Sequence, residues 1–259
     1  MIQKIKADNF EMDCISFGNG KKQMVILPGM DLEKMADSAK MIEQSFSAFH
    51  DDFRIYLFDR KDGMKKGYHI WDMAEDTAEA MKLIGISDAY VFGASQGGII
   101  SLYIAVNHPK LIKKLVVSST IARQNETSID TMETWRDLGR KGDAIALNRD
   151  CARRIYSEET LNNMKEYFKS VEKIGSKEQL ERFAVLAEGC LETDIYDRLC
   201  EIKCPMLAIG SEKDKVFSSK GVKEIAQKTG CELYIYKEYS HAVYDEAPDF
   251  KDRIKAFFE

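Results

Sequence analysis

Basic residues do not predominate in this 259-residue sequence, which contains 38 Lys and Arg against 43 Asp and Glu and carries a formal net charge of −5. Proteins that bind nucleic acid need a basic surface that neutralises phosphates. We therefore expect no nucleic-acid partner.

Long apolar segments are also missing. The longest nearly apolar run, residues 99–106, is far shorter than the roughly 20 residues that cross a bilayer. Residues 1–6 lack the apolar stretch of a secretory signal. We expect no membrane span and a cytoplasmic location.

Cysteine and histidine are scarce, with six and four residues respectively. The cysteines form no C-x-x-C pair and are too sparse for a disulfide scaffold. No histidines stand in an H-x-H or H-E-x-x-H spacing, so a metalloenzyme is not expected. We expect neither a metal nor another cofactor.

What the sequence does contain is an alternation of strand-like and helix-like segments, which is typical of a parallel sheet covered by helices on both faces. Residues 2–15, followed by Gly18-Asn19-Gly20, predict a β-hairpin or edge strands before the alternation begins. The predicted strands are residues 24–27, 54–58, 89–92, 115–117, 206–209 and 233–236, and the predicted helices include 36–49, 69–83, 96–107 and 221–228.

Residues 121–202 interrupt this alternation with three or four predicted helices. Ser176 and Gln179 fit a capping box at the start of one of them. A helical block inserted between two strands of one sheet cannot lie within that sheet. We therefore expect it to form a lid or cap over one edge or end of the sheet.

A serine lies at the turn between a predicted buried strand and an apolar helix, in the sequence Gly93-Ala94-Ser95-Gln96-Gly97. In a G-x-S-x-G turn the residues two positions on either side of the serine must be small, because the turn is tight and strained. A phosphate-binding turn is the alternative, but position 95 is not glycine and no lysine follows. The pattern predicts Ser95 as a nucleophile.

A serine nucleophile needs a histidine base. Only His241 follows the last predicted strand, where an α/β sheet of this kind places that base. His50, His69 and His108 lie at predicted helix ends or in polar segments, which favours ordinary solvated roles.

The acid that orients the base should follow another strand at the same end of the sheet. Asp214 follows the predicted strand 206–209 and precedes His241, which gives the chain order serine, acid, histidine. Glu212 is the rival acid, and we expect it to be a solvated loop charge. Asp59 and Asp62 follow an earlier strand, and residues 59–63 are interpreted as a turn.

Acyl transfer also requires backbone donors for the oxyanion. One is expected to be the N–H of Gln96, the residue after the nucleophile. The other is expected from the loop after the strand at residues 24–27, where Met30 is the candidate.

With these residues the chain resembles the α/β-hydrolase family over residues 20–119 and 203–258. It departs from many members at Pro28-Gly29, where His-Gly is common, and at Ser211, where glycine is common. The resemblance implies an α/β-hydrolase fold with a mostly parallel, doubly wound sheet. It also implies that residues 121–202 are a helical cap inserted into a core of residues 1–120 and 203–259.

Two apolar stripes in the block, Met132-Trp135-Leu138 and Met164-Phe168, could line an acyl pocket through Trp135 and Phe168. Packing within the block would require the same spacing and is the simpler interpretation. Similarly, Arg149, Arg153 and Arg154 could meet a substrate carboxylate or form a solvated helix face.

The resemblance is to capped serine hydrolases such as carboxylesterases and carbon–carbon bond hydrolases. We expect a serine hydrolase that cleaves a small or medium carboxylic ester, its small-molecule partner, through an acyl-enzyme. Cleavage of a thioester or a carbon–carbon bond by the same triad is the alternative among enzymes. A ligand-binding or signalling protein on the same scaffold is the alternative outside them.

Overall fold

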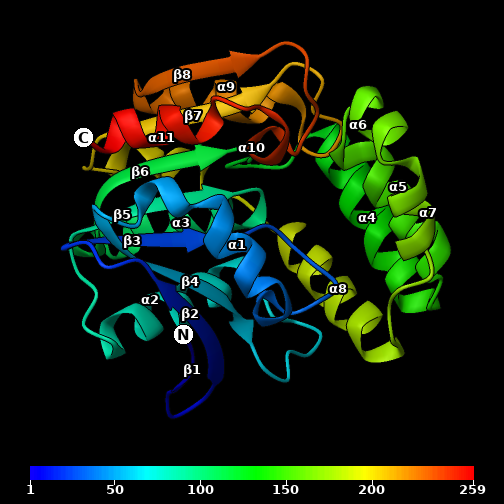
Figure 1. Cartoon of the computed structure of the whole chain (residues 1–259), viewed down its shortest axis with the longest axis horizontal. Coiled ribbons are helices and arrows are strands. Elements are labelled where there is room, and N and C mark those ends of the chain that lie inside the picture. Colours follow the sequence, from blue (N-terminus) through cyan, green and yellow to red (C-terminus); the bar gives the residue numbers. More distant parts are fainter.

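An eight-stranded sheet forms the centre of the molecule, in a computed structural model that describes residues 1–259 (Figure 1). The strands are β1 (Ile2–Lys6), β2 (Glu11–Phe17), β3 (Lys22–Leu27), β4 (Phe53–Lys61), β5 (Ala89–Ala94), β6 (Ile112–Ser118), β7 (Met206–Ser211) and β8 (Glu232–Tyr236). The α-helices are α1 (Ala39–Ser45), α2 (Ile70–Leu83), α3 (Gln96–Asn107), α4 (Glu126–Lys141), α5 (Ala144–Ile155), α6 (Glu158–Asn163), α7 (Lys165–Val171), α8 (Lys177–Cys190), α9 (Ser218–Thr229), α10 (Val243–Glu246) and α11 (Phe250–Phe258).

The strand order is β1-β2-β4-β3-β5-β6-β7-β8. β1 pairs with β2, and β2 with β4, in antiparallel fashion, which confirms the predicted edge hairpin. All pairings from β4 through β3 to β8 are parallel. The carboxyl ends of six strands therefore meet at one edge of the sheet, where loops of an α/β fold carry chemistry.

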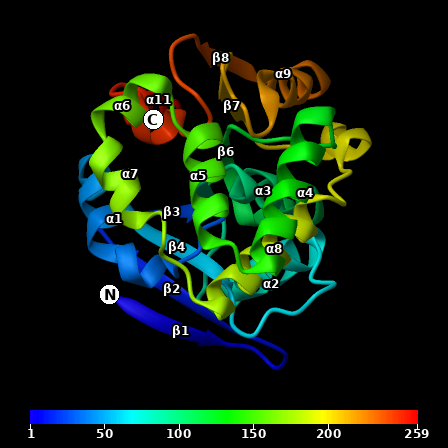
Figure 2. The same cartoon turned by 90° about the vertical axis from the view of Figure 1, so that its right-hand side faces the viewer.

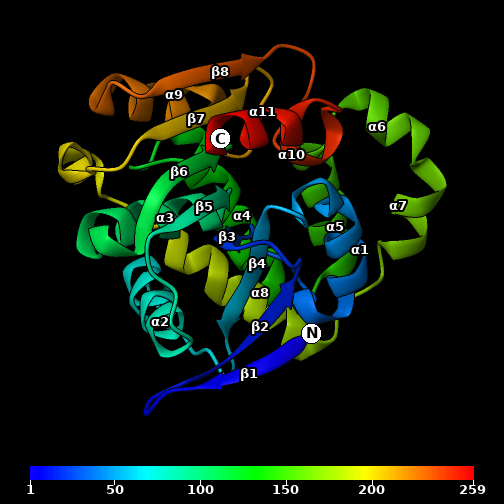
Figure 3. The same ribbon diagram turned by 60° about the vertical axis from the view of Figure 1, so that its left-hand side comes forward.

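The sheet has one apolar cluster on each face, and alternate residues of the central strands belong to different clusters, because successive side chains of a strand point to opposite faces. In β3, Val25 and Leu27 belong to one apolar cluster, whereas Met24 and Ile26 belong to the other. Helices α2, α3 and α9 contribute to the first cluster, and α11 to the second, with α1 packed against it (Figure 3). The sheet is thus covered on both faces, as predicted.

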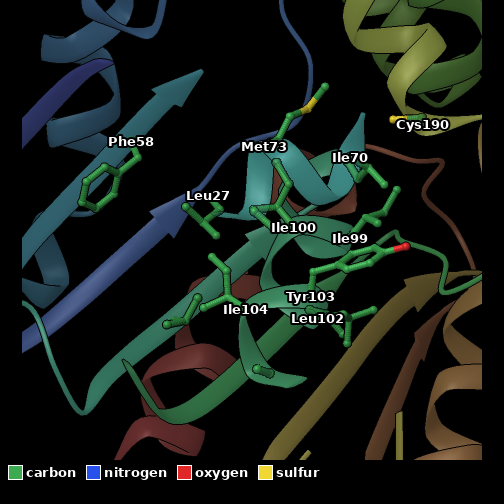
Figure 4. Close-up of a cluster of buried hydrophobic side chains, with 14 of the residues drawn as sticks. Leu27, Phe58, Ile70, Met73, Ile99, Ile100, Leu102, Tyr103, Ile104 and Cys190 are labelled. Carbon is green, nitrogen blue, oxygen red and sulfur yellow. The ribbon is translucent and has the colours of Figure 1, made fainter. Parts of the chain in front are cut away.

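Helix α3 is apolar around its whole circumference, as expected for a helix buried on all sides. It packs between β5, β6 and α2, and its side chains fill the larger cluster beside Leu27, Phe58, Ile70 and Met73 (Figure 4). The helix that begins directly after Ser95 is therefore held by packing along its length.

The predicted helix at residues 36–49 is shorter in the structure. Residues Met35–Ser38 form a 3₁₀ turn, α1 covers only Ala39–Ser45, and a second 3₁₀ turn spans Ser47–Phe49. The aromatic rings of Phe46 and Phe49 are buried here, so packing of these rings takes precedence over a regular helical path.

Helices α4 to α8 are inserted between β6 and β7, and they lie beyond the arrowheads of β3, β6 and β8 (Figure 1). Seen from that side, α4, α5 and α8 lie in front of the sheet (Figure 2). The insertion has five helices rather than three or four, because α6 and α7 are short separate segments of six and seven residues. The capping box at Ser176 and Gln179 is present.

The division into a core and a cap at residues 121 and 202 stays a prediction. None of the helices combines the length and apolarity required to cross a bilayer.

Candidate active site

Ser95 occupies the sharp turn between β5 and α3. Its backbone has φ 54° and ψ −122°, a conformation that costs a non-glycine residue strain. Two hydrogen bonds hold the turn: the Ser95 N–H donates to the Ser118 carbonyl oxygen at 2.9 Å, and the Thr120 hydroxyl donates to the Ser95 carbonyl oxygen at 2.8 Å. The side chain is thereby presented at the carboxyl edge of the sheet.

Glycine is required on both the strand side and the helix side of this turn. A Cβ atom at Gly97 would lie 1.9 Å from the carbonyl oxygen of Leu27 and 2.6 Å from that of Pro28. A Cβ atom at Gly93 would lie 2.6 Å from the carbonyl oxygen of Gly97. Gly97 therefore lets the serine turn pack directly on the end of β3 and the loop that follows it, and Gly93 lets β5 pack closely on the first turns of α3.

Ser95, His241 and Asp214 lie in hydrogen-bonding contact, although 146 residues separate the first two in the chain. His241 Nε2 is 2.9 Å from Ser95 Oγ, and His241 Nδ1 is 3.0 Å from each carboxylate oxygen of Asp214. All three residues are buried. Nucleophile, base and orienting acid therefore have the mutual geometry that nucleophilic catalysis requires.

The Asp214 carboxylate is fixed by its own loop. Its Oδ1 accepts hydrogen bonds from the backbone N–H groups of Val216 at 2.8 Å and Phe217 at 3.0 Å. Burial acts to raise the pKa of Asp214, but the charge and hydrogen bond of His241 and these two N–H donors outweigh it, so the pKa lies below its ordinary value. The acid is consequently a carboxylate at neutral pH.

The other predicted candidates lie elsewhere. Glu212 is exposed and pairs with Lys223 at 2.8 Å, as expected of a solvated loop charge. His108 contacts Glu75 at the end of α3, and His69 is the N-cap residue of α2. None of these side chains contacts Ser95.

The two predicted oxyanion donors flank the serine. Gln96 is the first residue of α3, so its N–H belongs to the helix donors that have no partner within the helix. The loop that carries Met30 passes close on the other side, since a Cβ atom at Gly29 would lie 3.6 Å from Ser95 Oγ. The structure thus brings both backbone segments to the serine hydroxyl.

A cavity of about 220 Å³ lies behind this loop, between α1 and the segment α10–α11. Gly29, Met30 and Ala94 line it next to the serine turn. Most of its other lining residues are apolar, among them Ile26, Met35, Ile42, Phe46, Leu57 and Phe92. The cavity thus adjoins the serine turn and has space for a small apolar group, although the triad side chains are not among its lining residues.

The structure places the two predicted pocket residues of the inserted helices away from this cavity. Trp135 is 2% exposed, packs on Phe183 and donates a hydrogen bond from Nε1 to Asp150 at 2.9 Å. Phe168 packs on Tyr156 and lines a separate hollow beside α5 and α7. For Trp135 this is the arrangement expected from packing within the helical block.

The three arginines of α5 are engaged with acidic side chains. Arg149 pairs with Glu172 at 2.9 Å, and Arg153 pairs with Asp150. Arg154 pairs with Asp150 at 2.7 Å and with Asp130 at 2.8 Å. Arg149 thereby connects α5 to the end of α7 and Arg154 connects α5 to α4, whereas the Arg153–Asp150 pair lies within α5.

The interpretation of residues 59–63 as a turn is wrong for its first three residues. Asp59 and Arg60 belong to β4 and are each 4% exposed, whereas Asp62 lies beyond the strand. The local sequence pattern did not indicate that the side chains of Asp59 and Arg60 belong to the surroundings of the site. The signal available was a charged pair directly after the apolar run 55–58.

Comparisons with known proteins identify the family to which the chain belongs. The family described as "alpha/beta hydrolase fold" matches residues 42–248. A protein of Serratia proteamaculans, carried under the provisional name carbamate hydrolase RutD, is 24% identical over 66% of this chain and 67% of its own. The 3-oxoadipate enol-lactonase 2 of Acinetobacter baylyi is 20% identical over 82% of this chain and 79% of its own. The crystal structure of the enol-lactonase from Burkholderia xenovorans LB400 superimposes with a TM-score of 0.86, at 19% identity, over 99% of both chains.

Proposed function

Since the chain belongs to the α/β-hydrolase fold family, we propose that it is a serine hydrolase that cleaves a small or medium carboxylic ester without a cofactor. The observation that carries this proposal is the unbroken series of contacts from Ser95 Oγ through the His241 ring to the Asp214 carboxylate. A protein that only binds a ligand does not need this arrangement.

The roles follow from the contacts. The Asp214 carboxylate accepts the hydrogen bond of His241 Nδ1–H, which leaves Nε2 as the acceptor that faces Ser95 Oγ. His241 takes the serine proton while Oγ attacks the ester carbonyl carbon. The N–H groups of Met30 and Gln96 then stabilise the negative oxygen of the tetrahedral intermediate.

The intermediate collapses by breaking the bond to the alkoxy group, which leaves as an alcohol with the proton from His241. Ser95 then carries the acyl group. Water gives a proton to His241 and attacks the acyl carbon; the bond from that carbon to Ser95 Oγ then breaks, Oγ takes the proton back from His241, and the carboxylic acid leaves. The positive end of α3 lies next to the reacting carbonyl and favours the negative charge that develops in both steps.

The cavity behind the Met30 loop supports an ester of limited size. Its volume of about 220 Å³ is below the 300–1,000 Å³ typical of pockets for drug-sized ligands. We place an apolar group of the ester there. The names of the relatives are compatible with such chemistry, because an enol-lactone is a cyclic ester and a carbamate also has a carbonyl open to attack by serine.

Steady-state turnover of chromogenic esters with acyl chains of graded length tests the proposal, with thioesters of the same acyl groups as a comparison. We expect sustained turnover that favours the shorter oxygen esters and that disappears in Ser95→Ala. Turnover that persists in Ser95→Ala, or a folded wild-type protein that hydrolyses none of these esters, would contradict the proposal.

A further inference from the structure

Arg60 is a buried cation without a carboxylate partner at ion-pair distance. The residue is 4% exposed at the end of β4. The carboxylate of its chain neighbour Asp59 is engaged by Arg182, which donates to Oδ1 at 2.7 Å, and by two backbone N–H groups, that of Arg60 to Oδ1 at 2.7 Å and that of Met35 to Oδ2 at 3.0 Å. Burying a charge is costly unless other groups compensate for the lost water. The position of Arg60 therefore calls for an explanation.

Its guanidinium instead bridges the two segments that supply the oxyanion donors. Nη2 donates to the Pro28 carbonyl oxygen at 2.7 Å, two residues before Met30. Nε donates to the side-chain oxygen of Gln96 at 3.1 Å. One rigid, planar group thus fixes the Met30 loop relative to the first residue of α3.

The Gln96 amide extends this connection to the inserted helices. Its Nε2 donates to the carbonyl oxygen of Leu186 at 3.0 Å and contacts the sulfur of Cys190 at 3.2 Å, both in α8. The side chain of Gln96 is fully buried. Strand β4, the serine turn and α8 are therefore joined through one arginine and one glutamine.

The positive charge of the Arg60 guanidinium gives this residue an electrostatic role in addition to its hydrogen bonds. Burial lowers the pKa of Arg60 to about 10, while the nearby Asp59 acts to raise it, so the guanidinium is cationic at neutral pH. A fixed positive charge in a buried site stabilises negative charge that develops nearby in a transition state. The nearest place where such charge develops in the proposed reaction is the oxyanion held by Met30 and Gln96.

We propose that Arg60 is a positioning residue of the hydrolase reaction: its guanidinium holds the two oxyanion donors in register and its charge favours the tetrahedral oxyanion. This inference rests on the proposed function and adds a residue that does not touch the substrate. It predicts that loss of Arg60 affects the transition state more than substrate binding.

The test compares Arg60→Met, Arg60→Lys and Gln96→Met with the wild type. Arg54→Met is the matched control, because Arg54 lies on the same strand and likewise donates to a carbonyl oxygen, of Gly18 at 3.0 Å, and to a hydroxyl, of Ser16 at 3.1 Å. The readouts are kcat and KM for the best ester, the affinity for an alkyl boronic acid that forms a tetrahedral anion on Ser95, and Tm.

For Arg60→Met we expect kcat to fall roughly 10²-fold, the lower end of the loss caused by removing one oxyanion donor, with KM within about threefold. Boronic acid affinity should fall by a similar order. Arg60→Lys retains the positive charge but not the planar guanidinium that donates to two acceptors, so its kcat should lie between those of Arg60→Met and the wild type. Gln96→Met should lower kcat by less than Arg60→Met, and Arg54→Met should leave kcat unchanged whatever its effect on Tm.

The outcomes separate the two proposals. If the wild type neither hydrolyses an ester nor binds the boronic acid, the proposed function fails and the role of Arg60 fails with it. If the wild type is active and folded Arg60→Met keeps its kcat and boronic acid affinity, the role of Arg60 alone is refuted. Should Arg60→Met not fold, equal kcat in wild type, Arg60→Lys and Gln96→Met would refute it as well.

Discussion

Replacing Gly97 by alanine tests whether the close approach of the serine turn to the Met30 loop matters for the reaction. The added Cβ would lie 1.9 Å from the Leu27 carbonyl oxygen, whereas ordinary contacts begin at 3.4 Å. The difference, 3.4 − 1.9, means that the two segments must separate by about 1.5 Å. The atom encountered belongs to the backbone of a central strand, so it cannot turn aside.

Such a shift would move the N–H group of Met30 away from the N–H group of Gln96, because the two oxyanion donors lie on the two segments that separate. A misplacement of about 1 Å can cost roughly 10²-fold in rate. We therefore expect Gly97→Ala to lower kcat for a reactive ester by at least about 10²-fold.

The assay is kcat for one ester, measured beside circular dichroism and Tm. Gly230→Ala is the control, because Gly230 has φ 69° but a Cβ there meets nothing within 4 Å. This control carries a backbone strain of roughly 1–2 kcal/mol without touching the site. Folded Gly97→Ala with kcat within threefold of the wild type would refute the reasoning, as would an equal loss in Gly230→Ala.

Three further outcomes follow from the described contacts. Asp214→Asn should lower kcat by roughly 10⁴-fold, whereas Glu212→Gln, whose carboxylate pairs with Lys223 on the surface, should change it little; the reverse result would place the acid two residues earlier. The lowered pKa of Asp214 stabilises the folded state at pH values above the ordinary Asp pKa of about 3.9, and this stabilisation is lost as the pH falls through the lower pKa of the folded state. Urea unfolding of the wild type and of Asp214→Asn between pH 2 and 6 would show this loss. Ile42→Trp should narrow the cavity and reduce turnover of longer esters more than of acetate esters, and an unchanged ester profile would place the substrate elsewhere.

Much of the fold could be predicted from the sequence because the central strands are buried on both faces and the segments between them have helical spacing. Residues 96–107 were predicted as a helix, and α3 has those bounds. The serine, acid and histidine could be proposed because each follows a strand whose carboxyl end meets the same edge of a parallel sheet. Local pattern and chain order were sufficient for these features.

The surroundings of the site could not be predicted in the same way. Asp59 and Arg60 have the composition of a turn, and only tertiary burial keeps them in β4. The contacts of the Gln96 side chain join segments that lie 36 and 90 residues apart in the chain, and no local pattern specifies such contacts. The role of Trp135 was likewise undecided, because a pocket and a packed helix interface require the same spacing.

The central claim is that Ser95 is activated by His241, and covalent labelling by a fluorophosphonate tests it most directly. Intact-mass measurement should show one adduct per chain in the wild type, and peptide mapping should place it on Ser95. Ser95→Ala should remain unlabelled, and His241→Ala should react far more slowly although it is folded. Labelling at another residue, no labelling of folded wild type, or labelling of His241→Ala at the wild-type rate would contradict the account.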